Sequence, residues 1–248
     1  FRYDPDSDEW DTLSDKPTPV TDVKAALIGE KLYIPGGLTA DGSPTNVLEI
    51  YDPRNDTWET GAPLPRAVSA YALADFEGRM YLFGGWDGEK ALAIVFIYDP
   101  TEDTWREGTP MTTARAETAG VALEDRIVIL GGRNETGALN HAQAYFPSRD
   151  INGEDPWEPF PDMPDSRYNF GAASMNNSIY VIGGEMEDSA LEEQIGWAFT
   201  EEGWVSFPTN QIYEGQPTTL VSLGAKLWLL DQSNQRRQTQ IWSYQAFY

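Results

Sequence analysis

The chain has 248 residues, enough for one domain with a substantial core, and no apolar run approaches the roughly 20 residues that span a bilayer. Its 40 acidic and 17 basic side chains give a formal net charge of −23, which argues against a role in binding nucleic-acid phosphates. The chain has no cysteine and one histidine, His141. This composition excludes disulfide frameworks, thiolate metal sites, cysteine nucleophiles and multi-histidine metal centres. We therefore expect no metal and no cofactor.

A short apolar run followed by two glycines occurs four times along the chain. The pairs are Gly36-Gly37, Gly84-Gly85, Gly131-Gly132 and Gly183-Gly184, and their first glycines are separated by 48, 47 and 52 positions. A fifth unit keeps the apolar run at 227–230 but has Asp231 and Gln232 in place of the glycines. Paired glycines allow backbone angles and close approaches that side chains forbid, so we predict a strand that ends at each pair.

A second marker recurs in phase with the glycines and joins an aromatic residue to a tryptophan seven positions later. The pairs with this spacing are Tyr3 and Trp10, Tyr51 and Trp58, Tyr98 and Trp105, and Trp197 and Trp204. In the third unit Tyr145 precedes Trp157 by twelve positions, which predicts five inserted residues in a loop. Asp-Pro follows three of the tyrosines and favours a turn, because proline fixes φ and aspartate bonds to nearby amides. The large rings are suited to filling the space between packed sheets.

Each unit divides into four short predicted strands. In the second unit they lie at 70–74, 80–83, 93–98 and 104–107, with tight connections such as Glu77-Gly78. The N-terminus begins late in a repeat, with an outer strand near 10–13. The C-terminus ends early in one, with strands near 218–223, 227–230 and 240–246. The sequence therefore predicts an all-β fold.

The two in-phase markers, which cover essentially the whole chain, resemble the kelch repeat. In this family one repeat forms one four-stranded antiparallel blade of a β-propeller, so the resemblance implies a single propeller domain over 1–248 and a framework role for the glycine and aromatic markers. Five pairs of first and second strands favour five blades. We place them at about 18–62, 66–110, 114–163, 167–208, and 216–248 together with 1–14.

The last of these blades is expected to close the ring. Open edge strands invite aggregation, so the N- and C-terminal strands are predicted to share one composite blade, with the C-terminal segment as its third strand. A six-bladed ring, whose missing strands lie outside this chain, is the alternative.

An arginine recurs in the segments that lead into first strands. Arg115 and Arg167 each stand sixteen positions before the first glycine of their unit, and Arg66 stands eighteen before Gly84. Propellers usually bind ligands on the face around the central channel, where these segments lie. We therefore predict three guanidinium groups on adjacent blades at one mouth, unpaired or holding an anion. The alternative is a framework role, in which they bond neighbouring backbone or resident carboxylates.

Three further residues are candidates for the same mouth. Trp86 and Arg133 begin the loops after the second and third glycine pairs, and Tyr168 follows Arg167. Trp86 offers a flat face for a sugar or a partner's apolar side chain, or else packs against its own loop. The corresponding loop of the fifth unit is 234–237.

Two other features receive no functional role. His141 lies at a predicted strand edge with no Ser or Asp partner in the sequence, which is typical of a surface or loop-bonding residue. Asp4, Asp6 and Asp8 alternate as in a calcium loop, but Glu9 stands where such a loop needs glycine. A turn explains the first aspartate without a metal.

We therefore expect a non-catalytic recognition module, a monomeric domain that binds an acidic peptide, a protein partner or an anionic carbohydrate, without nucleic-acid binding or membrane insertion. Galactose-oxidase-like copper chemistry needs a cysteine-modified tyrosine and more than one histidine, and the chain has neither. Sialic-acid mutarotases also resemble kelch propellers, so a carbohydrate isomerase that uses Arg, Glu and His141 at the mouth is the alternative. A structural spacer is a third possibility. The chain opens at Phe1 and not at Met, which favours one domain of a larger secreted or cell-surface protein.

Overall fold

The structure is a computed structural model that describes residues 1–4, 6–186, 196–207, 216–223, 226–233 and 238–245. Within these residues the chain forms four four-stranded sheets, one three-stranded sheet, two two-stranded hairpins and one short helix. No helix in the described ranges is long and apolar enough to cross a membrane. The all-β fold and its four-stranded antiparallel sheets confirm the prediction from the repeats.

The four complete sheets each use strands in chain order, and every neighbouring pair is antiparallel. They are β3 (Ala26–Ile28), β4 (Lys31–Pro35), β5 (Leu48–Asp52) and β6 (Thr57–Gly61); β7 (Ala72–Phe76), β8 (Arg79–Phe83), β9 (Val95–Asp99) and β10 (Thr104–Glu107); β11 (Ala119–Ala122), β12 (Ile127–Leu130), β15 (Ala142–Tyr145) and β16 (Trp157–Phe160); and β17 (Gly171–Met175), β18 (Ser178–Ile182), β19 (Gly196–Thr200) and β20 (Gly203–Phe207).

The remaining elements are shorter sheets and a helix. They are β1 (Arg2–Asp4) with β2 (Glu9–Asp11), β13 (Arg133–Asn134) with β14 (Gly137–Ala138), the sheet of β21 (Gln216–Leu223), β22 (Lys226–Ser233) and β23 (Gln238–Gln245), and α1 (Pro147–Ile151). In the fifth unit β22 continues to Ser233, through the two positions where the other units have glycines. The loop at 234–237 lies outside the described residues.

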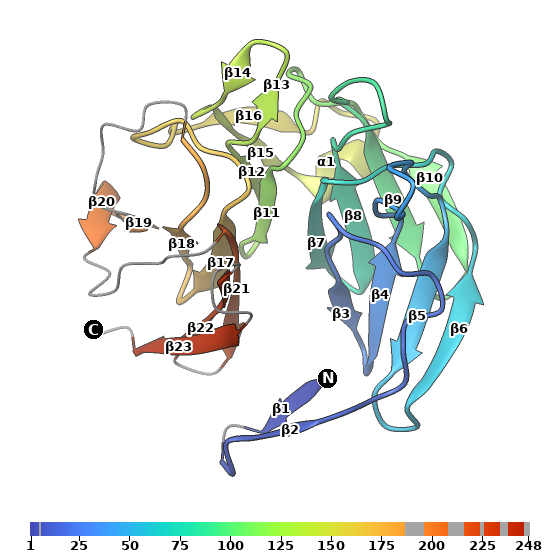
Figure 1. Cartoon of the computed structure of the whole chain (residues 1–248). Helices are drawn as coiled ribbons and strands as arrows, with labels where there is room; N and C mark the ends of the chain where they lie inside the picture. The colour runs from blue at the N-terminus through green and yellow to red at the C-terminus, as the bar shows by residue number, and fades with distance from the viewer. Residues whose placement is uncertain (5, 187–195, 208–215, 224–225, 234–237, 246–248) are drawn as a thin grey trace.

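The sheets are arranged radially, with the first strand of each nearest a common centre (Figure 1). The inner strands β3, β7, β11, β17 and β21 contact one another in that order. The strands predicted in the second unit are found within two residues. The first of them begins at Ala72 and not at Ala70, because Ala70 has a φ of +54° that no strand accommodates.

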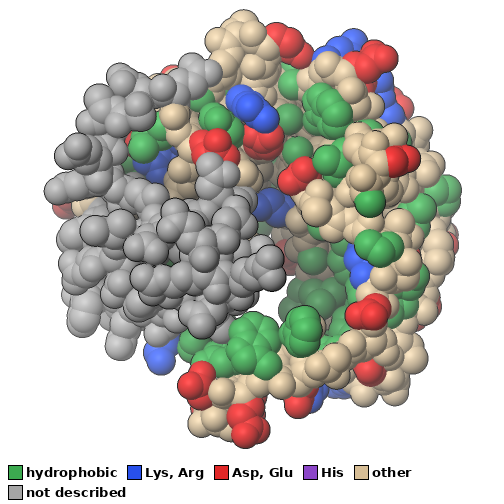
Figure 2. Space-filling model, in the orientation of Figure 1, with side chains coloured by type: hydrophobic (Ala, Val, Ile, Leu, Met, Phe, Trp, Pro, Cys, Tyr) green, Lys and Arg blue, Asp and Glu red, His purple; other side chains and the backbone are tan. Residues whose placement is uncertain are grey.

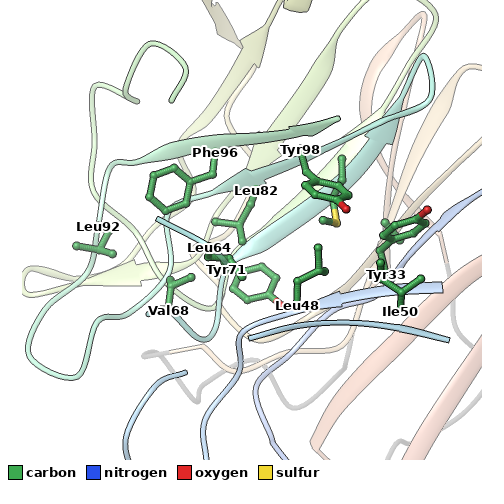
Figure 3. Packing of buried hydrophobic residues seen from close by; sticks show 12 residues of the cluster. Tyr33, Leu48, Ile50, Leu64, Val68, Tyr71, Leu82, Leu92, Phe96 and Tyr98 are labelled. Carbon is green, nitrogen blue, oxygen red and sulfur yellow. The ribbon is translucent and has the colours of Figure 1, made fainter. Parts of the chain in front are cut away.

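The hydrophobic core lies between successive sheets. In β8, Met80 and Leu82 pack toward the β3–β6 sheet, whereas Tyr81 and Phe83 pack toward the β11–β16 sheet. This alternation is the period of two that a strand imposes, and here both faces are buried. Figure 3 shows the cluster between the first two sheets, which includes Leu48 and Tyr98. The strands β8 and β12 therefore each contribute to two cores, and their sheets depend on both neighbours.

The glycine pairs join each sheet to the next, and we call these contacts the inner joints. Gly84 donates its N–H to the Ile94 carbonyl at 2.9 Å, and Gly85 donates to the Arg115 carbonyl at 2.8 Å, in the segment that leads into β11. Gly37 to Val68 and Gly132 to Arg167 repeat the second bond at 2.9 Å. The φ values of Gly84 and Gly85 are +64° and +102°, and a Cβ on Gly84 would overlap the Arg115 carbonyl oxygen.

The aromatic markers build a second set of contacts, the outer joints, at the other side of the sheets. The Trp105 indole donates to the Ala62 carbonyl of the preceding sheet at 2.9 Å. Asp103 accepts hydrogen bonds from the Ala62 N–H and the Tyr98 hydroxyl, both at 2.7 Å, and these donors lower the pKa of Asp103. Asp56 with Trp58 and Asp150 with Trp157 make the same contacts to Ser14 and Thr109.

At two places the observed structure differs from what the spacing of the aromatic residues alone predicts. The five extra residues of the third unit follow Asp150, which still reaches Thr109, so the turn after α1 accommodates the insertion without disturbing the joint. In the fourth unit Trp204 lies opposite Phe199 and not Trp197, because the hairpin there is two residues shorter. The spacing of seven between Trp197 and Trp204 is therefore coincidental, and the Trp197 indole instead donates to Asp165 at 2.7 Å.

The N-terminal hairpin makes an outer joint of its own. Tyr3 lies opposite Trp10, and the Trp58 indole donates to the Ser14 carbonyl. The β1–β2 hairpin therefore contacts the β3–β6 sheet in the same way in which the β5–β6 pair contacts the β7–β10 sheet. Asp4 and Asp8 serve this hairpin, since they accept from the Asp6 N–H and the Tyr3 hydroxyl. Among the described strands this hairpin and the β21–β23 sheet are separate, so the expected composite blade is not formed by them.

The inner joint predicts a difference between two glycines that both have positive φ. Gly84→Ala is expected to lower the free energy of unfolding by about 2–4 kcal/mol, because its Cβ meets a neighbouring backbone oxygen. Gly78, with φ of +75° and no atom within 4 Å of an added Cβ, is the matched control and should lose only about 1 kcal/mol. Urea denaturation measures both, and equal losses would contradict the steric role of the joint.

Candidate functional site

Four equivalent main-chain positions precede the inner strands of the four complete sheets and are linked to one another in a row, which we call the inner ring. Asp22, Ala70, Glu117 and Asn169 each stand fourteen residues before the first glycine of their unit, and each has φ between +51° and +56°. The N–H of Ala70, Glu117 and Asn169 donates to the carbonyl of the preceding member at 2.6–2.8 Å. Because the backbone makes these bonds, the side chains at the four positions are available for another role.

A pocket of about 410 Å³ lies over this ring, and we call it the mouth pocket. Asp22, Ala70 and Glu117 belong to its lining. Its walls come from the loop that starts at Trp86 and from the β13–β14 hairpin that carries Arg133. Figure 2 shows this face hollowed near its centre, with charged side chains of both signs beside the hollow. The sequence candidates Trp86 and Arg133 are therefore brought to one pocket.

A chain of polar contacts crosses the edge of the mouth pocket. Arg133 Nη2 donates to Glu117 Oε1 at 2.7 Å, and its guanidinium carbon lies 4.7 Å from the centre of the Tyr168 ring. The Tyr168 hydroxyl donates to Glu185 Oε2 at 3.0 Å. Arg133 keeps half of its side chain exposed. Tyr168, the third candidate, thus orients the arginine from the adjacent sheet.

Glu117 is the least satisfied group of the site. Its Oε2 is buried and has no hydrogen-bond partner in the part of the chain that the structure describes, although Oε1 is paired with Arg133. Burial raises the pKa of Glu117, and the nearby carboxylates of Glu185 and Asp22 add to the rise, so the pairing with Arg133 does not fully compensate the loss of water. A carboxylate in this state favours a ligand that brings a hydrogen-bond donor.

The three recurrent arginines are not equivalent, and the expectation of three unpaired guanidinium groups is not met. Arg115 is fully buried, donates to the carbonyls of Gly131 and His141, and contacts the His141 ring. Arg167 is 2 % exposed and binds Asp165 through two nitrogens, at 2.6 and 2.5 Å. Desolvation lowers the pKa of Arg115 to about 10. Both side chains fill the space between strands and are not open to solvent.

Arg66 differs because the inner joint identifies Val68, not Arg66, as the counterpart of Arg115 and Arg167. Arg66 lies two residues earlier, is about half exposed, and pairs with Asp87 at 2.5 Å.

Glu117 and Glu185 were not predicted as site residues, and the contact of His141 with Arg115 was not predicted either. The signal for Glu117 is its position fourteen before the glycine, where the units share a backbone conformation but no residue type. His141 lies outside the mouth pocket: its Nδ1 is 2.7 Å from Arg115 Nη2, and burial together with this guanidinium lowers its pKa.

Comparison with known proteins agrees with the observed sheets and joints. A family model described as the KLHDC2/KLHL20/DRC7 Kelch-repeats domain matches residues 1–184. No curated protein is significantly similar to the chain. Among solved structures, one described as "Structure of YjhT" superposes with a TM-score of 0.77 over 95% of this chain and 84% of that chain. The two are 14% identical, so this likeness concerns the fold alone.

The raised pKa of Glu117 predicts that this carboxylate costs stability at neutral pH. The ionised form is disfavoured in the fold, so Glu117→Gln should raise the melting temperature at pH 7. The gain should vanish as the pH falls below the ordinary glutamate pKa of about 4.5, where both states are protonated. Thermal unfolding at several pH values tests this, with the exposed Glu102→Gln as control. A melting temperature lowered by Glu117→Gln at pH 7 would refute it.

Proposed function

The chain belongs to the kelch-repeat family, and from this premise we propose that it is a non-catalytic recognition module that binds a protein partner at the mouth pocket. The observation that carries the proposal is the pair of Arg133 and Glu117. This pair combines a half-exposed guanidinium with a buried carboxylate oxygen that has no partner in the described ranges, and Trp86 lines the same pocket. Such a combination offers charge, hydrogen bonds and apolar area to one segment.

Arg133 supplies the anion-binding part of the proposal. One of its nitrogens is bound to Glu117, and within the described residues no acceptor is found for the other two. These nitrogens suit a carboxylate of an acidic peptide, or of an anionic carbohydrate. The lining holds four carboxylates, of Asp22, Glu89, Glu117 and Glu135, against the cations of Lys90 and Arg133. A segment with one acidic residue among neutral or basic residues is therefore favoured over a run of acids.

The two aromatic candidates, Trp86 and Tyr168, have different roles in this proposal. Trp86 is half-buried at the wall of the mouth pocket and covers an apolar side chain of the partner. Tyr168 holds Arg133 in place through its ring. Arg66 stands outside the pocket lining and binds only at the rim, while Arg115 and Arg167 act through the main chain that they support.

The proposal also covers the propeller that carries the mouth pocket. We propose a single monomeric propeller domain in which β1 and β2 form the outer half of the blade that precedes β3–β6. Their outer joint to Asp56 and Trp58 supports this placement. Because β23 already fills the third-strand place beside β22, a sixth blade accommodates the hairpin more readily than the five-blade ring does.

A second candidate function is a carbohydrate isomerase, because a carboxylate with a raised pKa next to an arginine is equipped to move protons on a sugar. The test is the rate at which the anomers of N-acetylneuraminic acid interconvert, followed by NMR with and without the protein. Acceleration that Glu117→Gln abolishes supports the isomerase, and an unchanged rate rejects it for this sugar.

The binding proposal predicts that Arg133 and Trp86 determine affinity. An array of peptides that each hold one Asp or Glu among neutral residues is screened, and the peptides retained are measured by calorimetry. Arg133→Ala should weaken their binding about tenfold or more, because a charged hydrogen bond is worth about 1.5–3 kcal/mol. Trp86→Ala should weaken it by a similar factor.

The matched control is Arg54→Ala, which removes an exposed arginine from the β5–β6 turn and leaves the mouth pocket intact. It should leave the affinity unchanged. If Arg54→Ala and Arg133→Ala weaken peptide binding equally, or if neither changes it, the peptide does not bind at the mouth pocket.

A further inference from the structure

A groove on the side of the molecule is separate from the mouth pocket. It has a volume of about 660 Å³, within the range of ligand sites, and lies between the segment after β10 and the outer strand β16. Its lining includes His141, Gln143, Glu154, Asp155, Trp157 and Glu158, none of which lines the mouth pocket. We call it the side groove. The repeat pattern does not explain its polar residues.

Arg115 fixes the tautomer of His141 at the inner end of the side groove. A guanidinium nitrogen only donates, so the 2.7 Å contact from Arg115 Nη2 requires His141 Nδ1 to accept. The neutral imidazole then carries its proton on Nε2. Burial and the adjacent guanidinium lower the pKa of His141, which keeps the ring neutral at physiological pH. The groove is thereby given a fixed N–H donor for which the described residues supply no acceptor.

Gln143 provides the second polar group. It stands two residues after His141, so both side chains lie on the same face of the strand. Its side-chain nitrogen donates to Thr112 Oγ1, but Oε1 is buried and has no partner among the described residues, and the residue is only 6 % exposed. Whichever way the amide is turned, one end of it is unsatisfied. A native interior rarely leaves such a group unpaired, so this end points to a ligand.

The charge of the side groove is negative. Glu154, Asp155 and Glu158 contribute three carboxylates, and no Lys or Arg of the described residues belongs to the lining. Glu158 also binds Arg149 at 2.6 Å, and Asp155 Oδ1 accepts from the Trp157 N–H at 3.1 Å. Neither contact uses both oxygens of its carboxylate. The groove therefore complements a ligand with positive charge.

We propose that the side groove binds a short, extended basic segment of a partner protein. A peptide group carries both a donor and an acceptor, and so matches the unsatisfied end of Gln143 and the Nε2–H of His141 together. An Arg or Lys side chain of the same segment then reaches Glu154 and Asp155. A neutral glycan satisfies the first two groups but leaves the carboxylates without a counter-charge, and an acidic segment is repelled.

The test uses the single histidine of the chain as a reporter. The full chain is titrated with the capped pentapeptide Ala-Arg-Ala-Arg-Ala, and the imidazole signals of His141 are followed by NMR. We expect a saturable shift of these signals, no comparable shift with capped Ala-Glu-Ala-Glu-Ala, and none with maltotriose. No shift at saturating arginine peptide, or an equal one with maltotriose, overturns the proposal.

Two sets of variants separate specific binding from general attraction to an acidic protein. Glu154→Gln with Asp155→Asn should weaken arginine-peptide binding about tenfold. Glu201→Gln with Glu202→Gln removes the same charge from the exposed β19–β20 turn and should change it less than twofold. Equal effects of the two pairs would mean non-specific attraction and would refute the site.

Gln143→Met gives an independent readout. It replaces a half-satisfied buried amide by an apolar side chain of similar size, so the melting temperature should stay the same or rise while peptide binding weakens. Unchanged binding by a folded Gln143→Met protein would show that the amide does not contact the segment.

Discussion

The fold depends on the main-chain hydrogen bond by which the second glycine of one unit reaches the segment leading into the next sheet. Gly85 to Arg115 is one example, and a Cβ on the adjacent Gly84 would overlap the same Arg115 carbonyl oxygen, so this approach requires a glycine at position 84. The outer joint, in which Trp105 and Asp103 grip Ala62, fixes the other side of the same pair of sheets. With both edges held, the rings and aliphatic side chains between two sheets pack in one register, and burial of both faces of β8 follows.

The same joints position the functional groups. The inner ring of Asp22, Ala70, Glu117 and Asn169 is held through backbone atoms in a left-handed conformation, so the residue type at these positions is not determined by the fold. Glu117 is placed in the lining of the mouth pocket, where burial makes its charge costly. Proteins tolerate such costs at binding sites, because a group left unsatisfied in the free protein is completed by the ligand. The mouth thus combines a rigid frame with variable side chains.

Features that need a particular backbone conformation or a short spacing could be predicted from the sequence. Features that depend on contacts between residues far apart in the chain could not. The glycine pairs and the Tyr–Trp spacing gave the strands and their order, because both arise from constraints that act over a few residues. Arg115 and Arg66 precede their glycines by sixteen and eighteen positions, yet only Arg115 is buried, because the main-chain hydrogen bond to the glycine of the preceding unit falls on Arg115 in one segment and on Val68 in the other. Trp197 matched a spacing by chance. Glu117 escaped notice because its environment comes from three different units.

Amide hydrogen exchange tests the role of the joints most directly. If the joints couple the sheets, the N–H groups of Gly37, Gly85 and Gly132 and those of Ala70, Glu117 and Asn169 open only with global unfolding. They should then exchange in one slow class with the central strands and follow the same denaturant dependence. Exchange of these amides at rates that differ from sheet to sheet, well before the strands of β8 and β12 exchange, would contradict the account.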